Sequence, residues 1–428
     1  MNHIGPEAIL RKKQEYLIPC VYHFYKKPMQ IVKGEMQYLY DHTGRQYLDF
    51  YGGVSVMNTG HCNTEVVERI CEQVKTLQHT TTIYLTQPIV DLAEILAQIT
   101  PGTLRRSFFC ASGSEANEGA ALLAQLYTAR HKFVSVREGL HGRTKFTMNL
   151  TGIPMWRTDP FPLDNIVHIP AAYCYRCAYN LTYPDCNLKC ACILEDIVKN
   201  GDFAAFIIEP IQGNGGIITP PPEYFALIRE ITNHYGVLLI TDEVQTGFGR
   251  TGKMFAIEHW NTVPDILTLA KALANGTPIG AFITHDKIAA SYSRPGASTT
   301  GGNPVSAVAA LATIETIQKH HLAERANELG NFFMEKLKLL QQEHPIIGDV
   351  RGKGLMIGAE LVKNNKTPAT EETDFILEEL KDRGILAGKT GMSRNVLTFQ
   401  PPLIITRNDI DRVASTLDEI LCRLEMPK

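Results

Sequence analysis

Short apolar runs alternate with longer amphipathic segments between residues 65 and 300, and this alternation restricts the fold more than any other feature of the sequence. The apolar runs are typical of buried strands; they are SFFCAS, KFVSV, AAFIIEP, VLLITDE and GAFIT. Ser114–His131 and Glu223–Gly236 lie between them and have the residue pattern of helices. The alternation predicts an α/β fold in which helices cover both faces of a large, mostly parallel sheet.

Different patterns precede and follow this region. MQYLYDHTGRQYLDFYGG comes before it and predicts strands joined by turns, whereas long helices begin at about Ser306. GDVRGKGLMIGAELV follows these helices and predicts a small antiparallel sheet. A chain of 428 residues is long enough for more than one domain. We therefore predict a large domain over 65–304 and a smaller α+β domain built from segments 1–64 and 305–428.

Charge and hydropathy indicate which kinds of partner and which cell compartment to expect. The formal net charge is −3, which gives no reason to expect a nucleic acid or an anionic membrane as partner. No apolar run reaches the roughly 18–20 residues of a membrane span. MNHIGPEAILRKKQEY carries charges where a signal peptide would need an apolar stretch. We therefore expect a cytoplasmic protein whose thiols stay reduced.

Five of the ten cysteines gather in CYRCAYNLTYPDCNLKCAC, residues 174–192, which we call the cysteine-rich segment. Its cysteines, Cys174, Cys177, Cys186, Cys190 and Cys192, have spacings that a zinc site can use, but the intervening gap matches no zinc module. The segment is also aromatic and loop-like. We interpret it as a reduced structural insertion. The alternative is a metal-held interaction module in a non-catalytic binding protein.

Polar residues follow several predicted strands, at the edge where open α/β sheets bind ligands. Ser112, Gly113 and Ser114 lie between a strand and a helix, a junction that suits a phosphate but is equally common as a turn and helix cap. Glu209 and Asp242 follow two other strands. Because an unpaired buried carboxylate is costly, we expect VLLITDEVQTGFGRTG to direct a carboxylate toward a positive partner or an open site.

Lys271 is unusual because it lies in an otherwise uncharged stretch, Ile266–Phe282, that is rich in glycine and small residues. A buried lysine with a lowered pKa is suited to forming an imine, whereas a lysine at a domain edge would extend its amine to solvent. A phosphate seat, a carboxylate and a lysine together are what pyridoxal 5'-phosphate (PLP) requires.

These residues lie in motifs that resemble the class III aminotransferases, which are PLP enzymes of fold type I. The resemblance covers nearly the whole chain, and its longest motif is TDEVQTGFGRTGKMFAIEHWNTVPDILTLAKALANGTPIGA. Shorter motifs are YLDFYGGVSVMNTGH, ASGSEANEGA, LHGRT, IIEPIQGNGG, TTGGNP and VRGKGLMIGAEL. GHCNTEVVERICEQVKTLQHTTTIYLTQPIVDLAE is most similar to the alanine–glyoxylate and 3-aminoisobutyrate–pyruvate transaminase branch.

The resemblance implies a role for each residue of the cofactor site. Lys271 matches the lysine that forms a Schiff base with PLP and moves a proton between the substrate carbon and the cofactor. Asp242 matches the carboxylate that pairs with the pyridine nitrogen, with Val244 against the ring and Gln245 on the phenolic oxygen. The phosphate would lie against residues 112–114.

The resemblance also implies a homodimer with shared active sites, with a tetramer as the alternative. Thr299 matches the threonine that reaches the phosphate from the neighbouring subunit. Tyr84 lies in a segment that lines the neighbouring subunit's site in relatives, although a single aromatic residue is equally suited to a core. Glu209 resembles the acidic residue beside the substrate pocket.

Two positions depart from the family pattern. Leu140 stands before the HG pair where relatives have a stacking aromatic residue, so an aliphatic contact or His141 would cover the ring, and Arg143 of the same motif is structural. Thr398 stands where many relatives have an arginine that binds the substrate carboxylate. Arg394 either replaces that arginine or is a surface charge.

We therefore predict a transaminase that moves an amino group from a β- or ω-amino acid, or alanine, to a 2-oxo acid such as pyruvate or glyoxylate. A 4-aminobutyrate- or ornithine-type enzyme using 2-oxoglutarate is an alternative. A PLP-dependent racemase or epimerase is another, because it would need the same cofactor residues.

Overall fold

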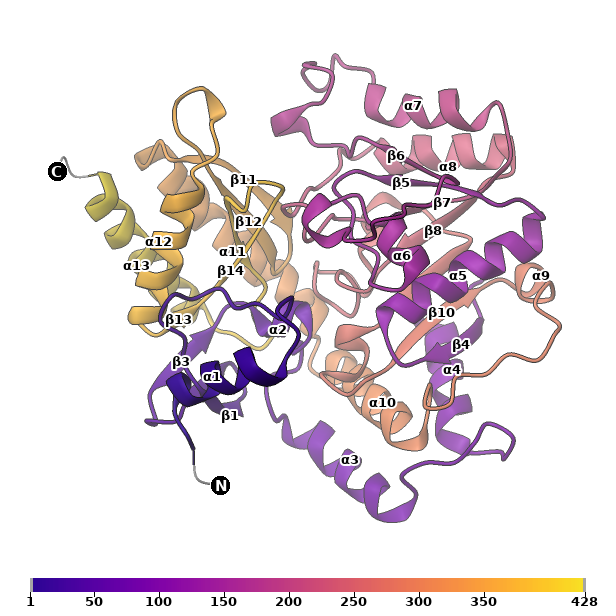
Figure 1. Cartoon of the computed structure of the whole chain (residues 1–428), viewed down its shortest axis with the longest axis horizontal. Helices are drawn as coiled ribbons and strands as arrows, with labels where there is room; N and C mark the ends of the chain where they lie inside the picture. Colours follow the sequence, from indigo (N-terminus) through magenta and orange to yellow (C-terminus); the bar gives the residue numbers. More distant parts are fainter. Residues whose placement is uncertain (1–2, 426–428) are drawn as a thin grey trace.

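The computed structural model describes residues 3–425 and contains three β-sheets in that range (Figure 1). The largest sheet has seven strands in the order β4-β10-β9-β8-β7-β5-β6. The strands are β4 (Arg106–Cys110), β5 (Lys132–Val136), β6 (Ile166–Ile169), β7 (Phe203–Ile208), β8 (Leu238–Asp242), β9 (Ile266–Leu269) and β10 (Gly280–Thr284). The five strands predicted from apolar runs all belong to this sheet.

Most neighbours in the large sheet are parallel. The pairs β6–β5, β5–β7, β7–β8 and β8–β9 are parallel, whereas β10 runs antiparallel to both β4 and β9. A mostly parallel sheet is therefore confirmed. β6 and β9 were not predicted, because each has only four residues and stands out less than the longer apolar runs.

Helices cover both faces of this sheet, as predicted. Side chains of β7 alternate between the faces: Ala205 and Ile207 join one apolar cluster, and Phe206 and Ile208 join the other. The first face is covered by α5 (Gly113–Thr128), α6 (Lys145–Leu150) and α9 (Asp286–Ala289). The second is covered by α4 (Gln87–Ile99), α7 (Lys189–Val198), α8 (Tyr224–Tyr235) and α10 (Pro304–Lys319).

Two four-stranded sheets combine the first and last parts of the chain. One has the order β1-β2-β3-β13, in which Leu48 of β3 pairs with Ile385 of β13. Its strands are β1 (Ile31–Glu35), β2 (Tyr38–Asp41), β3 (Gln46–Asp49) and β13 (Ile385–Leu386). Figure 1 shows these indigo and yellow elements together on one side of the molecule. This pairing is the reason to expect one domain from both chain ends; the boundaries at 64 and 304 remain a prediction.

The other four-stranded sheet has the order β11-β12-β15-β14. Its strands are β11 (Ile347–Lys353), β12 (Met356–Leu361), β14 (Gly388–Thr390) and β15 (Val396–Phe399). The antiparallel β11–β12 pair confirms the small sheet predicted from GDVRGKGLMIGAELV. The remaining helices are α1 (Pro6–Tyr16), α2 (Gly52–Ser55), α3 (Thr64–Thr76), α11 (Leu322–Glu343), α12 (Thr370–Asp382) and α13 (Arg407–Glu425).

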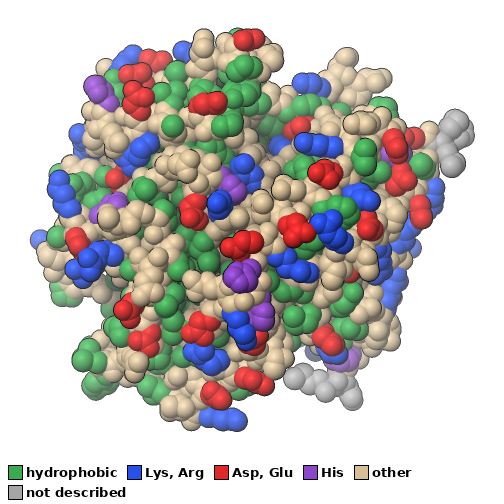
Figure 2. All heavy atoms as spheres, turned by 180° about the vertical axis from the view of Figure 1, so that it is seen from behind, with side chains coloured by type: hydrophobic (Ala, Val, Ile, Leu, Met, Phe, Trp, Pro, Cys, Tyr) green, Lys and Arg blue, Asp and Glu red, His purple; other side chains and the backbone are tan. Residues whose placement is uncertain are grey.

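Figure 2 shows the face opposite the view of Figure 1, where acidic and basic side chains are interspersed among apolar ones. Neither sign of charge dominates that face. Within residues 3–425, no helix combines the length and the apolar character needed to cross a membrane.

Candidate active site

A cavity of about 370 Å³ lies where β7, β8 and β9 end, beside the start of α5. Its volume falls in the range of roughly 300–1,000 Å³ that is usual for small-molecule sites. The structure brings ten predicted site residues together around it: Ser112, Gly113, Ser114, Leu140, His141, Glu209, Asp242, Val244, Gln245 and Lys271. Arg143 also lines the cavity.

Asp242, the last residue of β8, is buried and held by three contacts. Its Oδ2 accepts a hydrogen bond from Asn117 Nδ2 at 2.7 Å and lies 2.8 Å from His141 Nδ1. Its Oδ1 accepts a hydrogen bond from the Val244 N–H at 3.1 Å. Asn117 was missed by the sequence interpretation, although a polar residue among the buried alanines of α5 marks such a position.

The neighbouring carboxylate, Glu243, points elsewhere. It accepts hydrogen bonds from the N–H groups of Ala256 at 3.0 Å and Ile257 at 2.8 Å, and from the Thr246 hydroxyl. Burial raises its pKa to about 7. The two carboxylates at the end of β8 therefore point in different directions. Asp242 lines the cavity, whereas Glu243 accepts hydrogen bonds from the first N–H groups of a 3₁₀ helix.

Lys271 follows β9 and opens a 3₁₀ turn, Lys271–Ala274. Its φ of 48° lies in the left-handed region, which is unusual for a non-glycine residue and typical of functional sites. Burial lowers the pKa of Lys271, and the negative charges of Glu209 and Asp242 oppose that decrease. The amine is therefore enclosed beside two carboxyl groups rather than extended to solvent.

Glu209 follows β7 and is fully buried. It accepts hydrogen bonds from the N–H groups of Leu140 at 2.9 Å and Gly213 at 3.0 Å. Burial raises its pKa to about 7, and the charge of Asp242 adds to the increase. Gln245 packs so closely against Gly213 that a β-carbon there would lie 1.9 Å from Gln245 Oε1. The loop after β7 thus packs against a residue that lines the cavity.

The start of α5 offers backbone N–H groups to the cavity. Ser112 caps the helix by accepting a hydrogen bond from the Glu115 N–H at 3.2 Å, and Ser114 Oγ accepts one from the Arg143 N–H at 3.0 Å. A β-carbon on Gly113 would lie 2.9 Å from Val244. Ser112 therefore caps the helix at a junction that also lines the cavity.

Tyr84 and Thr299 do not line this cavity. They lie together at a separate hollow of about 530 Å³ formed by residues 80–90 and 299–304. Tyr84 is 67% exposed, and the adjacent Ile83 and Leu85 are 83% and 100% exposed. Three large side chains in a row are therefore left uncovered within this chain, and Tyr84 is not a core residue.

Arg394 lies in the turn between β14 and β15, outside the set of cavity-lining residues. Its guanidinium lies over the Phe24 ring, 5.2 Å from the centroid. Its Nη2 is buried and has no hydrogen-bond partner among residues 3–425. Thr398 is buried, and its hydroxyl lies 2.6 Å from that of Thr390. Arg394 is thus half-buried, with one guanidinium nitrogen enclosed.

Comparison with known proteins identifies the family. The family model for Aminotransferase class-III matches residues 22–421. The chain belongs to the class-III aminotransferases. This aminotransferase is 43% identical, over 99% of its length and 89% of the relative, to alanine–glyoxylate aminotransferase 2 homolog 2, mitochondrial, from Arabidopsis thaliana.

Relatives with other named activities are also similar. A leucine/methionine racemase from Thermococcus litoralis is 38% identical, with 93% of this chain and 91% of the relative covered. A solved amine transaminase from an uncultivated Pseudomonas species, in its PLP-bound form, has a TM-score of 0.89 at 30% identity, with 96% of this chain and 98% of that chain covered. The enzyme class predicted from the sequence is confirmed; the relatives differ in their named reactions.

Class-III aminotransferases depend on PLP, and the cavity fits this group. Asp242 offers a carboxylate for a ring nitrogen, Lys271 offers an amine for an aldehyde, and the start of α5 offers N–H groups for a phosphate. His141 Nε2 is buried at the cavity wall and has no hydrogen-bond partner among the described residues. A buried polar atom without a partner is expected where a ligand completes the site.

Proposed function

We propose that Lys271 would hold PLP through an imine bond to its aldehyde carbon, with the aldehyde oxygen released as water, and that Asp242 would pair with the ring nitrogen. The observation that carries the proposal is their convergence in one cavity with the start of α5. PLP supplies an aldehyde that takes up the donor's amino group and a ring that withdraws electrons from the adjacent carbon.

Side chains of the protein would transfer protons and orient the cofactor. Because burial lowers the pKa of Lys271, its amine is a suitable base for the proton on the donor's carbon. Asp242, oriented by His141 and Asn117, would keep a proton on the ring nitrogen. Val244 would pack on the ring, and Gln245 would donate to the phenolic oxygen.

We further propose that Arg394 binds the carboxylate of the substrate. Its Nη2 is buried without a partner, a state that an incoming carboxylate would relieve. Thr398 supplies no charge at the position where many relatives have the arginine. Donors that place the carboxylate farther from the amine, such as β- and ω-amino acids, are therefore favoured beside alanine, with pyruvate or glyoxylate as acceptor. Glu209 would border the space that the substrate occupies in the cavity.

A second copy of the chain completes the site in this proposal. The exposed Ile83, Tyr84 and Leu85 supply an apolar contact surface, and Thr299 lies beside them at the same hollow. In the dimer, Thr299 would reach the phosphate in the partner's cavity. The ten cysteines are free thiols, which supports a reducing, cytoplasmic location.

A panel of donors and acceptors tests the function. Purified holoenzyme is mixed with β-alanine, 3-aminoisobutyrate, 4-aminobutyrate, taurine, ornithine or alanine, first alone and then with pyruvate, glyoxylate or 2-oxoglutarate. We expect a lasting change in the cofactor's visible absorbance with the donor alone, and its reversal by pyruvate or glyoxylate. Reversal by 2-oxoglutarate alone would contradict the proposed acceptor.

The same panel separates transamination from racemisation, which the racemase among the relatives makes a specific competitor. A racemase would invert a single amino acid without any 2-oxo acid. Inversion without a lasting absorbance change would contradict the proposed transfer of an amino group.

A further inference from the structure

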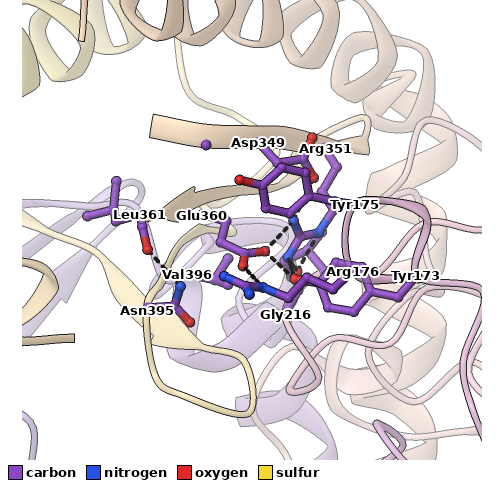
Figure 3. A network of polar contacts seen from close by, with 12 residues as sticks. Tyr173, Tyr175, Arg176, Gly216, Asp349, Arg351, Glu360, Leu361, Asn395 and Val396 are labelled. Carbon is purple, nitrogen blue, oxygen red and sulfur yellow. Dashed lines mark hydrogen bonds and ion pairs between the residues drawn. The ribbon is translucent and has the colours of Figure 1, made fainter. Parts of the chain in front are cut away.

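Arg351, on β11, is the centre of a partly buried polar network outside the cavity (Figure 3). Its Nη1 donates to Asp349 Oδ2 at 2.7 Å and Glu360 Oε2 at 2.8 Å. Its Nη2 donates to the Tyr173 hydroxyl at 2.9 Å. Nε and Nη2 both donate to the Gly216 carbonyl, at 2.9 and 2.6 Å. The guanidinium therefore joins three separate parts of the chain.

The cysteine-rich segment supplies one side of this network. Glu360, on β12, accepts hydrogen bonds from the hydroxyl of Tyr173, which directly precedes the segment, and from Arg176 within it. Arg176 Nη2 donates to the Lys366 carbonyl at 2.8 Å, and Lys366 Nζ donates to the Tyr175 carbonyl at 3.0 Å. The segment is thus fastened to the β11–β12 hairpin by side chains that hold Arg351 in one orientation.

The other side of the network is the loop after β7, which forms part of the cavity wall. Gly216 has a φ of 118°, and a β-carbon there would lie 3.1 Å from Arg351 Nη2 and 3.3 Å from Gly391 Cα. Gly216 therefore permits the close approach of the guanidinium on one side and of the β14–β15 turn on the other. Gly213, in the same loop, contacts Gln245 and donates to Glu209.

This loop leads directly to Arg394. The Asn214 carbonyl accepts a hydrogen bond from the Gly391 N–H at 3.0 Å, and the Gly391 carbonyl accepts one from the Arg394 N–H at 3.0 Å. A continuous series of hydrogen bonds and close contacts therefore connects the cysteine-rich segment, through Arg351 and Gly216, to the turn that carries Arg394.

We propose that Arg351, oriented by Tyr173 and Arg176, is a positioning residue that fixes the Gly391–Arg394 turn for carboxylate binding. This inference rests on the proposed function of Arg394. A planar guanidinium that donates in several directions orders the groups around it, and a binding residue needs such support to stay within about 0.5 Å of its productive position. The cysteine-rich segment then serves substrate recognition.

Tyr173→Phe tests this directly, because it removes the hydroxyl between Arg351 and Glu360 and keeps the ring. Tyr183→Phe is the matched control: Tyr183 lies in the same segment, but its hydroxyl contacts Glu223, 2.9 Å away on the protein surface. Hydrogen–deuterium exchange of the peptide spanning residues 389–396 is measured in each holoenzyme. We expect faster exchange in Tyr173→Phe and unchanged exchange in Tyr183→Phe.

Steady-state kinetics of the same variants test whether substrate carboxylate binding is weakened. We expect KM for a carboxylate-bearing donor to rise about tenfold in Tyr173→Phe, the effect of one weakened hydrogen-bond network, while kcat and cofactor absorbance are unchanged. KM for an amine without a carboxylate should not change. Arg351→Lys, which keeps the charge but not the planar fork, should show the same KM effect.

Three results would overturn the inference. One is unchanged exchange at 389–396 in Tyr173→Phe. Another is a lower melting temperature with unchanged KM, which would indicate a purely structural role. The third is faster exchange with equal KM effects for donors with and without a carboxylate. Failure of the proposed function is distinguishable, because it appears as absence of amino transfer in the wild-type enzyme, while the exchange measurement is independent of turnover.

Discussion

The cofactor side and the substrate side of the candidate site are built in different ways. On the cofactor side, ten predicted residues line one cavity, and most of them follow a strand or start a helix of the large sheet. On the substrate side, Tyr84 lies at a separate hollow together with Thr299, and Arg394 lies in the turn between β14 and β15 of another sheet. Most of the first side comes from one sheet, whereas the second combines elements from separate parts of the chain.

This difference follows from the geometry of parallel sheets. The carboxyl ends of neighbouring parallel strands meet at one edge, so residues that follow them are brought together by the sheet itself. A turn such as Gly391–Arg394 has no such constraint and needs side-chain contacts to place it. We therefore expect substitutions on the two sides to have different kinetic consequences.

The largest effect is expected for Lys271→Ala on the cofactor side. Loss of the amine should reduce turnover by more than about a thousandfold and remove the visible absorbance of the bound cofactor, because it removes both the covalent attachment and the base. Borohydride reduction followed by peptide mapping checks the attachment point in the wild-type enzyme. Lys253→Ala, at an exposed lysine, is the control; trapping at another residue would disprove the assignment.

Asp242→Asn should have the next largest effect. An amide cannot stabilise the protonated ring nitrogen as a carboxylate does, so kcat should fall by about 10²–10³-fold while some cofactor remains bound. Glu243→Gln is the matched control, since Glu243 bonds the 3₁₀ helix instead of lining the cavity. It should affect thermal stability more than kcat. Equal kcat in Asp242→Asn and wild type would contradict the proposed pairing.

Arg394→Met should affect the substrate side and leave the cofactor side unchanged. Removing a charged hydrogen-bond donor costs about 1.5–3 kcal/mol, so KM for carboxylate-bearing donors should rise by about 10–100-fold. Steady-state kinetics with an amine that lacks a carboxylate should be unchanged, and so should cofactor absorbance. Arg407→Met, at an exposed ion pair with Glu328, controls for loss of a positive charge. An equal increase in KM for both kinds of donor would disprove the carboxylate contact.

The smallest effect is expected at His344, which lines neither the cavity nor the separate hollow. Burial alone would lower its pKa, but hydrogen bonds to Glu425 and Asp418, at 2.9 and 2.8 Å, raise it above the usual value. The resulting stability is fully present below about pH 6.5 and is lost as the pH rises through the raised pKa.

Thermal unfolding of wild type and His344→Gln at pH 6 and pH 9 tests whether this contribution to stability decreases as the pH rises. The wild type should be more stable by about 1 kcal/mol or less at pH 6, and the difference should shrink at pH 9. KM and kcat should be the same in both proteins. A difference that grows with pH would contradict the assignment.

Much of the cofactor side was predictable because the relevant residues are adjacent to strong local patterns. Asp242 ends an apolar run, Lys271 is the single charge in an apolar stretch, and Gly113 lies between a strand and a helix. Asn117 and Gly213 were not predicted, since their importance comes from Asp242 and Gln245, which lie far from them in the sequence. The antiparallel direction of β10 was equally invisible to periodicity, which does not encode strand direction.

The sequence by itself determined the class of fold, the enzyme family and the identity of the groups available for PLP, because apolar periodicity and short motifs are local properties. Only the tertiary structure decided that Asp242 and Glu243 diverge, that Arg394 is partly enclosed beside Phe24, and that the cysteine-rich segment is fastened to β11–β12. These are long-range contacts, and their geometry results from the packing of segments that no local pattern relates to one another.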